Sequence, residues 1–233
     1  ATSSALSITV DTGTPAAPAV TAITFDSGTN NDQITSDTTL VFSGTAEANA
    51  TVEVFIDAAS IGIASADGSG NWSYDHTGTT LSVGSYSITA TAQDLAGNTS
   101  VASSALSVTV DTAAPAAPAV TAITDDTNTA SDGVTSDNQL MISGTAEANS
   151  SVEVFVDAVS IGTITADGSG NWSYDHTSTT LADGSYSVTA SATDTSGNVS
   201  ATSSALSITV DTGTPAAPAV TEITSDTGTN NDQ

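Results

Sequence analysis

The chain contains no lysine and no arginine among its 233 residues, whereas aspartate and glutamate together number 26. Its formal net charge is therefore -26 at pH 7. Because nucleic-acid phosphates and anionic lipid surfaces are bound through Lys and Arg, this composition excludes nucleic acid as a partner and adsorption to an acidic membrane surface. Each carboxylate must face water, accept hydrogen bonds from neutral donors, or bind a cation from the medium.

Cysteine is also absent, so disulfides, thiolate chemistry and Cys-ligated zinc are excluded. No apolar run is long enough for a membrane span, and we expect no direct insertion into a membrane. The N-terminus lacks the basic start and apolar stretch of a signal peptide, so we expect any export signal to lie outside this sequence. Aromatic residues make up only 4%, but hydrophobic residues make up 38%, many of them in strand-like spacing. The chain should fold, with small cores.

A period of one hundred residues runs through the sequence. Residues 1–20 recur unchanged at 201–220, and residues 67–77 recur unchanged at 167–177. Self-similarity at a fixed period indicates tandem structural units. We divide the chain into the last strand of a preceding module (1–10), two complete modules (11–110 and 111–210) and the start of a following module (211–233).

Within each unit, short alternating segments are separated by turn residues, which is typical of an antiparallel all-β domain. Val52, Val54 and Ile56 alternate with polar or larger neighbours, so one face of this strand should be buried. The segment Asp-Gly-Ser-Gly-Asn at 67–71 predicts a hairpin turn, because Gly and Asn readily adopt a positive φ. We expect no helix and seven strands, near residues 18–24, 38–43, 51–57, 60–66, 71–76, 85–92 and 100–110.

Strand counting places the acidic residues at the two ends of each sandwich. Asp11, Glu47 and Asp94 should meet at the N-terminal end, while the loop 26–37 and the exit at Asp111 should lie at the opposite end. Each junction then joins two acidic ends, and a like-charge pair at roughly 4 Å costs about 1 kcal/mol even in water. Ca²⁺, which takes six to eight oxygen ligands, would convert this repulsion into a cross-link. The candidate ligands are Asp11, Glu47, Asp94, Asp111, Glu147, Asp194, Asp26, Asp32, Asp126, Asp132 and Asp211.

A simpler interpretation of any single acidic residue is that it is a solvated turn residue, since Asp is common in turns. Glu53, Asp57 and Asp75 lie in or beside strands, and we interpret them in this way.

Trp72 and Trp172 could stack on a sugar, but we expect them in the core. His76 and His176 lack the companions that zinc needs, so we expect loop residues. No catalytic arrangement is present, and we expect that the protein is not an enzyme.

Several motifs together resemble the bacterial immunoglobulin-like repeats of giant RTX-type adhesins. They are the Val-Asp-Thr linker with Pro-Ala-Ala-Pro, and the segments at 43–47, 67–72, 84–90 and 94–100. The resemblance implies tandem immunoglobulin-like Greek-key β-sandwiches of about seven strands, arranged head to tail. In that family the repeats are extender modules that hold an adhesive domain away from a Gram-negative cell surface after type I secretion, and calcium at the junctions stiffens the rod. It also points to Asp11, Glu47 and Asp94, with Asp111, Glu147 and Asp194, as metal ligands.

We therefore expect a calcium-stiffened extender of a large bacterial surface adhesin that serves cell adhesion and biofilm formation. Its partners would be calcium ions and the adjacent modules of the same chain, in a monomeric rod. Its location would be extracellular, on a parent protein anchored in the outer membrane. Two alternatives remain open: the modules could bind glycans or another cell directly, or they could adhere homophilically and dimerise with calcium.

Overall fold

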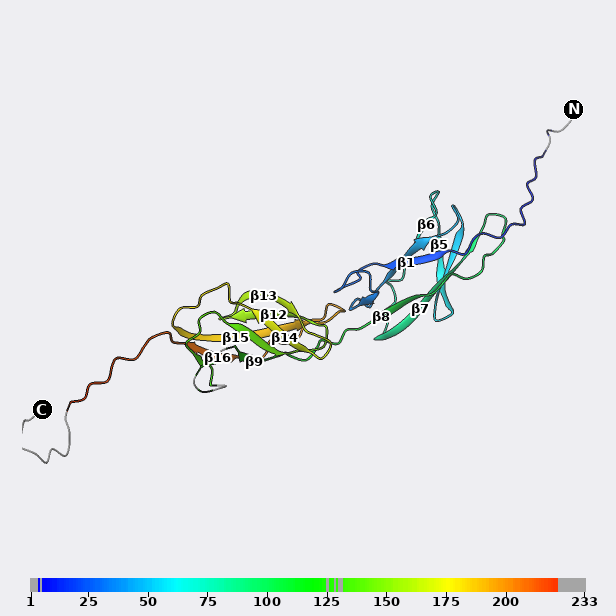
Figure 1. Cartoon of the computed structure of the whole chain (residues 1–233). Coiled ribbons are helices and arrows are strands. Elements are labelled where there is room, and N and C mark those ends of the chain that lie inside the picture. Colours follow the sequence, from blue (N-terminus) through cyan, green and yellow to red (C-terminus); the bar gives the residue numbers. More distant parts are fainter. Residues whose placement is uncertain (1–3, 5, 125, 128, 130–131, 222–233) are drawn as a thin grey trace, which may run out of the picture.

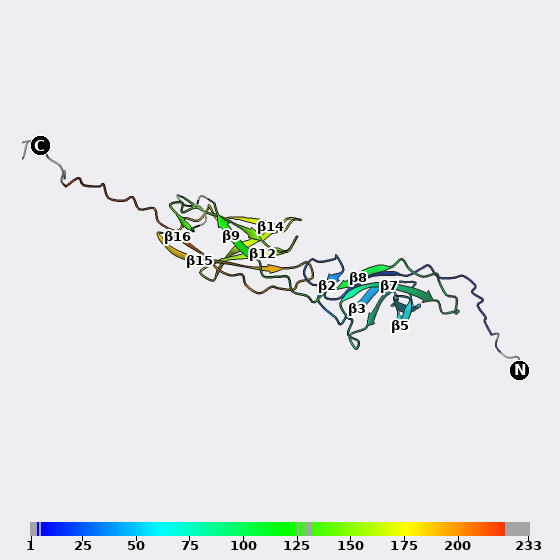
Figure 2. The same cartoon turned by 90° about the horizontal axis from the view of Figure 1, so that it is seen from below.

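The computed structural model describes residues 4, 6–124, 126–127, 129 and 132–221, and these residues form an all-β structure with no helix. No membrane-spanning helix is therefore found among them. Two similar sandwiches follow one another along the molecule, and the segments before the first strand and after the last leave at opposite ends (Figures 1 and 2). We call the sandwich of strands β1–β8 module 1 and that of strands β9–β16 module 2. The predicted fold class is confirmed.

Each module is a sandwich of one three-stranded and one five-stranded sheet. In module 1 the sheets have the strand orders β1-β3-β6 and β2-β8-β7-β4-β5, and module 2 repeats them as β9-β11-β14 and β10-β16-β15-β12-β13. All pairs are antiparallel except β2 with β8 and β10 with β16. The strands of module 1 are β1 Ala19–Ile23, β2 Ile34–Thr35, β3 Val41–Thr45, β4 Thr51–Ile56, β5 Ala59–Ser65, β6 Asn71–Asp75, β7 Gly84–Gln93 and β8 Leu106–Val110. Those of module 2 are β9 Ala119–Ile123, β10 Val134–Thr135, β11 Met141–Thr145, β12 Ser151–Val156, β13 Val159–Thr165, β14 Asn171–Asp175, β15 Gly184–Thr193 and β16 Leu206–Val210.

The core lies between the two sheets. Val52, Val54 and Ile56 are buried, as the alternation predicts, and Phe42 lies opposite them on β3. Trp72 is also buried, at 3% exposure, and packs in this core. The expectation of a core tryptophan is therefore confirmed, and Trp172 is equally buried. A sugar-stacking platform at either ring is excluded by this burial.

Gly44 makes room for the Trp72 ring. A Cβ atom added at Gly44 would lie 2.7 Å from Trp72 Cζ2 and 1.9 Å from the carbonyl oxygen of Ala19. Both separations are shorter than any normal van der Waals contact. Glycine is thus required here by the close approach of β1 and the indole, and Gly144 has the same relation to Trp172.

The last strand is shorter than predicted, because β8 begins at Leu106 and residues 101–105 form no strand. Serine side chains replace regular pairing in this segment. Ser100 Oγ and Ser103 Oγ accept hydrogen bonds from the N–H groups of Ala92 and Ala90 on β7, at 2.9 and 3.0 Å. Such local side-chain bonds compete with a regular ladder. A second difference is the two-residue strand β2, which the sequence pattern does not predict.

The flanking segments contain no strand within residues 6–18 and 211–221. Leu6, Ile8 and Val10 alternate as in a strand, yet all three are exposed. The assignment of residues 1–10 to a preceding module and of 211–233 to a following one stays a prediction. Residues 1–3, 5 and 222–233 of these segments lie outside the described residues.

Candidate metal sites at the ends of the modules

Asp11, Glu47 and Asp94 line one depression at the N-terminal end of module 1. The depression has a volume of about 350 Å³, and Thr9, Ala48, Leu95 and Ala96 complete its lining. The three acidic residues come from the entering linker, the loop between β3 and β4, and the loop between β7 and β8. Strand counting predicts this gathering, and the structure brings these three residues together as expected.

The loop that carries Asp94 is organised by its carboxylate. Asp94 Oδ1 accepts hydrogen bonds from the N–H groups of Ala96 and Asn98 at 2.9 and 2.8 Å, and Oδ2 accepts one from Asn98 Nδ2 at 2.8 Å. These bonds, above all that from the Asn98 side chain, lower the pKa of Asp94 below its usual value. Asn98 Nδ2 also reaches the Asp11 carbonyl oxygen at 3.3 Å. The linker is thus tied to the loop, and the carboxylate stays ionised at neutral pH.

The corresponding residues of module 2 lie at the junction between the modules. Asp194 accepts hydrogen bonds from the backbone and the side chain of Asn198, at 2.8 and 2.9 Å. Asn198 Nδ2 also donates to the Asp111 carbonyl oxygen at 2.9 Å, and the Asp111 N–H donates to the Thr35 carbonyl oxygen of module 1 at 2.9 Å. Asp111 is therefore hydrogen-bonded to both modules. Glu147 is exposed on the loop between β11 and β12.

The loop between β1 and β2 holds two buried oxygen atoms that accept no hydrogen bond. They are Asp26 Oδ1 and Gln33 Oε1. The other Asp26 oxygen accepts the Gln33 N–H at 3.3 Å, so the two residues are neighbours. Asp32 is exposed, and its Oδ1 accepts the Ile34 N–H at 2.9 Å. Oxygen atoms left without donors fit a hard cation, which binds oxygen. Gln33 was not among the predicted ligands, and a search for acidic residues could not have found it.

In module 2 the same loop is built differently, because Gly133 replaces Gln33. Asp126 Oδ2 accepts the Gly133 N–H at 3.4 Å. Asp132 and Asp211 line a second depression together with Gly213 and residues 134–136. Asp132 Oδ1 accepts the Val134 N–H, and Asp211 Oδ1 accepts the Gly213 N–H, both at 2.9 Å. The structure therefore brings Asp132 and Asp211 together at the C-terminal end of module 2.

Within the described ranges, no three Asp, Glu, His or Cys side chains form a group that could hold a metal ion by themselves. A calcium site would have to recruit backbone carbonyl or amide oxygens beside the carboxylates, as calcium commonly does. Metal binding by the eleven predicted residues stays a prediction.

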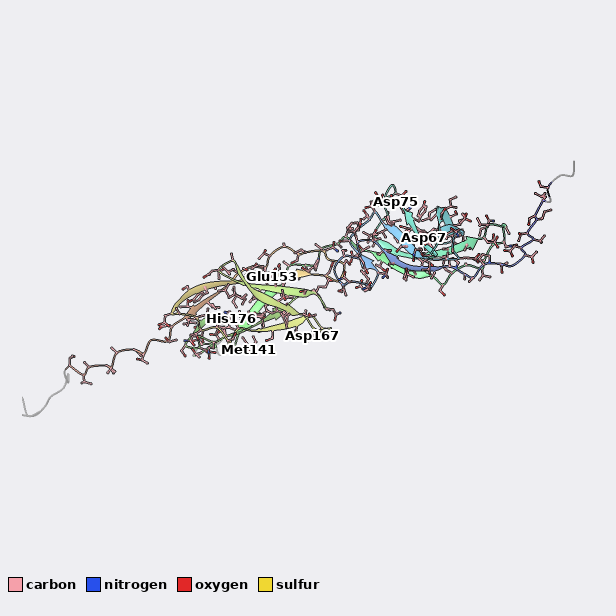
Figure 3. All side chains as sticks on the ribbon, turned by 90° about the horizontal axis from the view of Figure 1, so that it is seen from above. Asp67, Asp75, Met141, Glu153, Asp167 and His176 are labelled. Atoms are coloured by element: carbon pink, nitrogen blue, oxygen red, sulfur yellow. The ribbon has the colours of Figure 1, made fainter. Side chains whose placement is uncertain are left out.

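Four further acidic residues of module 1 also accept hydrogen bonds from neutral donors, one of them, Asp67, in the turn beside the Glu47 loop. Glu53 Oε1 accepts the Ser60 hydroxyl at 2.6 Å, and Asp57 Oδ1 accepts the Ser87 N–H at 2.9 Å. Asp67 organises its predicted hairpin turn by accepting the N–H groups of Ser69 and Asn71 at 2.8 and 2.9 Å. Asp67 and Asp75 lie on the surface of module 1 (Figure 3).

The pH dependence of stability should reveal the carboxylates that accept such hydrogen bonds. The side-chain and backbone hydrogen bonds from Thr77 lower the pKa of Asp75, as Thr177 does for Asp175. A lowered folded-state pKa gives stability that is complete above the unfolded pKa, about 3.8, and is lost as the pH falls through the folded value. Replacing both residues by alanine should lower the melting temperature at pH 7, and the gap to the unmodified protein should close below about pH 4. A gap that stays constant from pH 7 to strongly acidic pH would contradict this assignment.

Comparisons with known proteins give the family. A family model for the bacterial Ig-like domain matches residues 14–112 and again residues 114–212. No curated protein sequence matches the chain significantly.

Solved structures with similar folds include the fibronectin(III)-like modules of CbhA from Clostridium thermocellum, with a TM-score of 0.47 and 19% identity over 81% of this chain and 94% of that one. A 1.5-MDa bacterial ice-binding adhesin has a TM-score of 0.42 and 25% identity, over 84% of this chain and 64% of that one. A Ca²⁺-stabilised adhesin with which an Antarctic bacterium binds ice has a TM-score of 0.40 and 28% identity, over 86% and 50%.

Since these TM-scores are below 0.5, the family assignment rests on the family model, whose two matches together cover most of the chain. It agrees with the sandwich topology of both modules. The chain belongs to the bacterial Ig-like domain family and carries two tandem copies of that domain.

Proposed function

We propose that this chain is a structural spacer in a large bacterial surface adhesin, and that calcium bound at the module ends stiffens it. The observation that carries the proposal is the gathering of Asp11, Glu47 and Asp94 around one depression where a linker enters a module. With no Lys or Arg in the chain, no internal cation can neutralise these carboxylates. A divalent cation from the medium is the remaining counter-charge that also binds several oxygens at once.

The connection between the modules supports a spacer role. Asp111 is hydrogen-bonded to Thr35 of module 1 and to Asn198 of module 2, so the linker is held on both sides. The chain enters and leaves at opposite ends, which lets near-identical units add length along one direction (Figure 1). This geometry supports a role in presenting a distal domain. The resemblance of the linker and loop motifs to adhesin repeats points to an extracellular location on the bacterial surface and to adhesion and biofilm formation.

The donor atoms at the module ends fit calcium. They are carboxylates, carbonyl groups and the amide oxygen of Gln33, all of them hard oxygen ligands. Asp26 Oδ1 and Gln33 Oε1 are buried without hydrogen-bond donors, a state that is unfavourable unless a further partner binds. When bound, calcium would join groups from separate loops. The residues of this chain would hold it at Asp11, Glu47 and Asp94 and at Asp26 and Gln33.

The test is calcium titration calorimetry on the double variant Glu47→Gln and Glu147→Gln. Both side chains are exposed, so the substitution leaves the loop hydrogen bonds of Asp94 and Asp194 in place. We expect calcium affinity to fall about ten- to hundredfold, since loss of even a supporting group at a metal site has such an effect. The matched control is Glu53→Gln with Glu153→Gln, which removes the same charge from strands β4 and β12 and should leave affinity unchanged. Equal binding by both double variants, or no binding by the unmodified chain, would refute the proposed site.

A further inference from the structure

Module 1 contacts module 2 directly through uncharged polar groups. Ser27, Gly28 and Thr29 of module 1 contact residues 195–197 of module 2, and we call this contact the latch. Ser27 Oγ donates a hydrogen bond to the Ser196 carbonyl oxygen at 2.6 Å, and the Thr29 N–H donates to the Thr195 carbonyl oxygen at 3.1 Å. The latch involves no carboxylate. Its two halves directly follow Asp26 and Asp194 in sequence, so it lies beside the proposed calcium ligands without using a carboxylate.

The latch covers the loop between β15 and β16 of module 2. Ser196 is only 1% exposed, whereas Ala96, at the same position of module 1, is exposed. In this structure module 1 packs against the loop of module 2. The burial of Ser196 is thus a signature of the junction.

Gly28 decides whether the latch can close. Its φ angle is +75°, and a Cβ atom added there would lie 2.1 Å from the Thr195 carbonyl oxygen and 2.6 Å from the Gly197 nitrogen. Both atoms belong to the backbone, so no rotation of a side chain could relieve the overlap. The acceptors of the two latch hydrogen bonds are backbone carbonyl oxygens, which every module has. The residue at the position of Gly28 therefore determines whether a module can latch onto the next.

Module 2 has Asn128 at this position. Its exit is secured in another way, by a contact that module 1 lacks. Asp183 Oδ1 accepts hydrogen bonds from the Thr212 N–H at 3.0 Å and from the Thr212 hydroxyl at 2.8 Å, which clamps the linker onto module 2 itself. Module 1 has Val83 in place of Asp183, and this side chain is 61% exposed.

The same alternation is visible in the sequence at twice the module period. Residues 1–33 differ from residues 201–233 only at positions 22, 25 and 27 of the earlier copy. They differ from residues 101–133 at eleven positions: 1, 2, 8, 13, 14, 25, 27, 28, 30, 31 and 33. Glycine returns at position 228, and the Gly-Thr of the linker at 13–14 returns at 213–214. The sequence unit that repeats most closely is thus a pair of modules.

We propose that the array alternates two kinds of junction. In the first, glycine at the position of Gly28 lets a module form the latch with the next module. In the second, the module has asparagine at this position and clamps its own linker through a contact like that between Asp183 and Thr212. The latched junction has a contact that needs no cation, in addition to any calcium bound beside it, and the clamped junction cannot form the latch. This goes beyond the proposed function, because it assigns a calcium-independent contact to every second junction.

The test uses thiol labelling in excess chelator, and it exploits the absence of cysteine in the chain. Ser196→Cys places a single thiol under the latch, and Ala96→Cys places one at the uncovered equivalent. We expect Cys at position 196 to be labelled at least about tenfold more slowly than Cys at position 96, as expected for a group reached only by local opening. Adding Gly28→Asn should raise the rate at position 196 to that at position 96.

Two further variants keep the test decisive. Gly97→Asn also lies at a positive φ, +92°, but has no atom within 4 Å of an added Cβ, so it should leave the slow labelling unchanged. Replacing residues 25–33 by the sequence of 125–133 should open the latch, and restoring glycine at position 28 in that loop should close it again. Unchanged tryptophan fluorescence checks that each variant is folded. Fast labelling at position 196 with Gly28 in place, or slow labelling after the loop exchange, would overturn the proposal.

Discussion

Replacing Trp72 by alanine will destabilise module 1 by about 3–5 kcal/mol, the usual cost of removing a large aromatic side chain from a core. The indole is 3% exposed and packs with Phe42, Val52 and Val54 in a core that contains few aromatic residues. Trp72 Nε1 is buried without a hydrogen-bond partner, so the substitution removes packing and not a polar contact. Because a domain of this size is typically stable by only about 5–15 kcal/mol, module 1 would lie close to unfolding.

Differential scanning calorimetry provides the measurement. The melting temperature of module 1 should fall by at least about 12 °C, since 1 kcal/mol of stability corresponds to roughly 4–8 °C in a domain of this size. Trp172 fluorescence then reports module 2 alone. The matched control is Phe25→Ala, which removes an aromatic side chain that is 78% exposed in the same module and should shift the transition little. A shift of less than a few degrees in the Trp72 variant would show that the core is organised differently.

Removing calcium will lower the melting temperature of the whole chain. Binding to the folded state alone stabilises a site by about 2.7 kcal/mol when the free ion is hundredfold above its Kd. For modules of about one hundred residues this corresponds to a loss of roughly 10–20 °C on adding excess chelator. The loss should be larger than for a mixed-charge protein, because the acidic module ends then repel each other without any internal cation.

Ionic screening must be separated from site binding in this experiment. A chain with a formal charge of -26 is stabilised by any salt, because 0.1 M salt reduces the Debye length to about 10 Å. The control is therefore chelator with sodium chloride at or above the ionic strength of the calcium buffer. If sodium chloride restores the full melting temperature, the acidic residues are merely screened and calcium has no specific site.

The strand pattern and the placement of the acidic residues could be predicted from sequence because both follow from short-range alternation and strand order. Val52 and Val54 face the core as a period of two requires. Asp11, Glu47 and Asp94 meet because successive loops of an antiparallel sandwich alternate between its ends.

Other features depend on contacts that no local pattern encodes. The strand predicted over residues 100–110 begins only at Leu106, because the hydroxyl groups of Ser100 and Ser103 satisfy the N–H groups of β7. Gln33 is neutral, so charge counting could not identify its buried oxygen atom as a candidate ligand. The role of Gly28 becomes apparent only when the backbone of module 2 is placed beside it.

The central claim, that calcium stiffens a rod of tandem modules, is tested most directly by small-angle X-ray scattering of this chain with millimolar calcium and again with excess chelator, at matched ionic strength. The account predicts that calcium increases the maximum dimension of the particle and narrows its distance distribution to that of a stiff rod. Identical scattering curves in the two buffers would contradict it, because the acidic residues would then be solvated surface groups with no role in stiffening the chain.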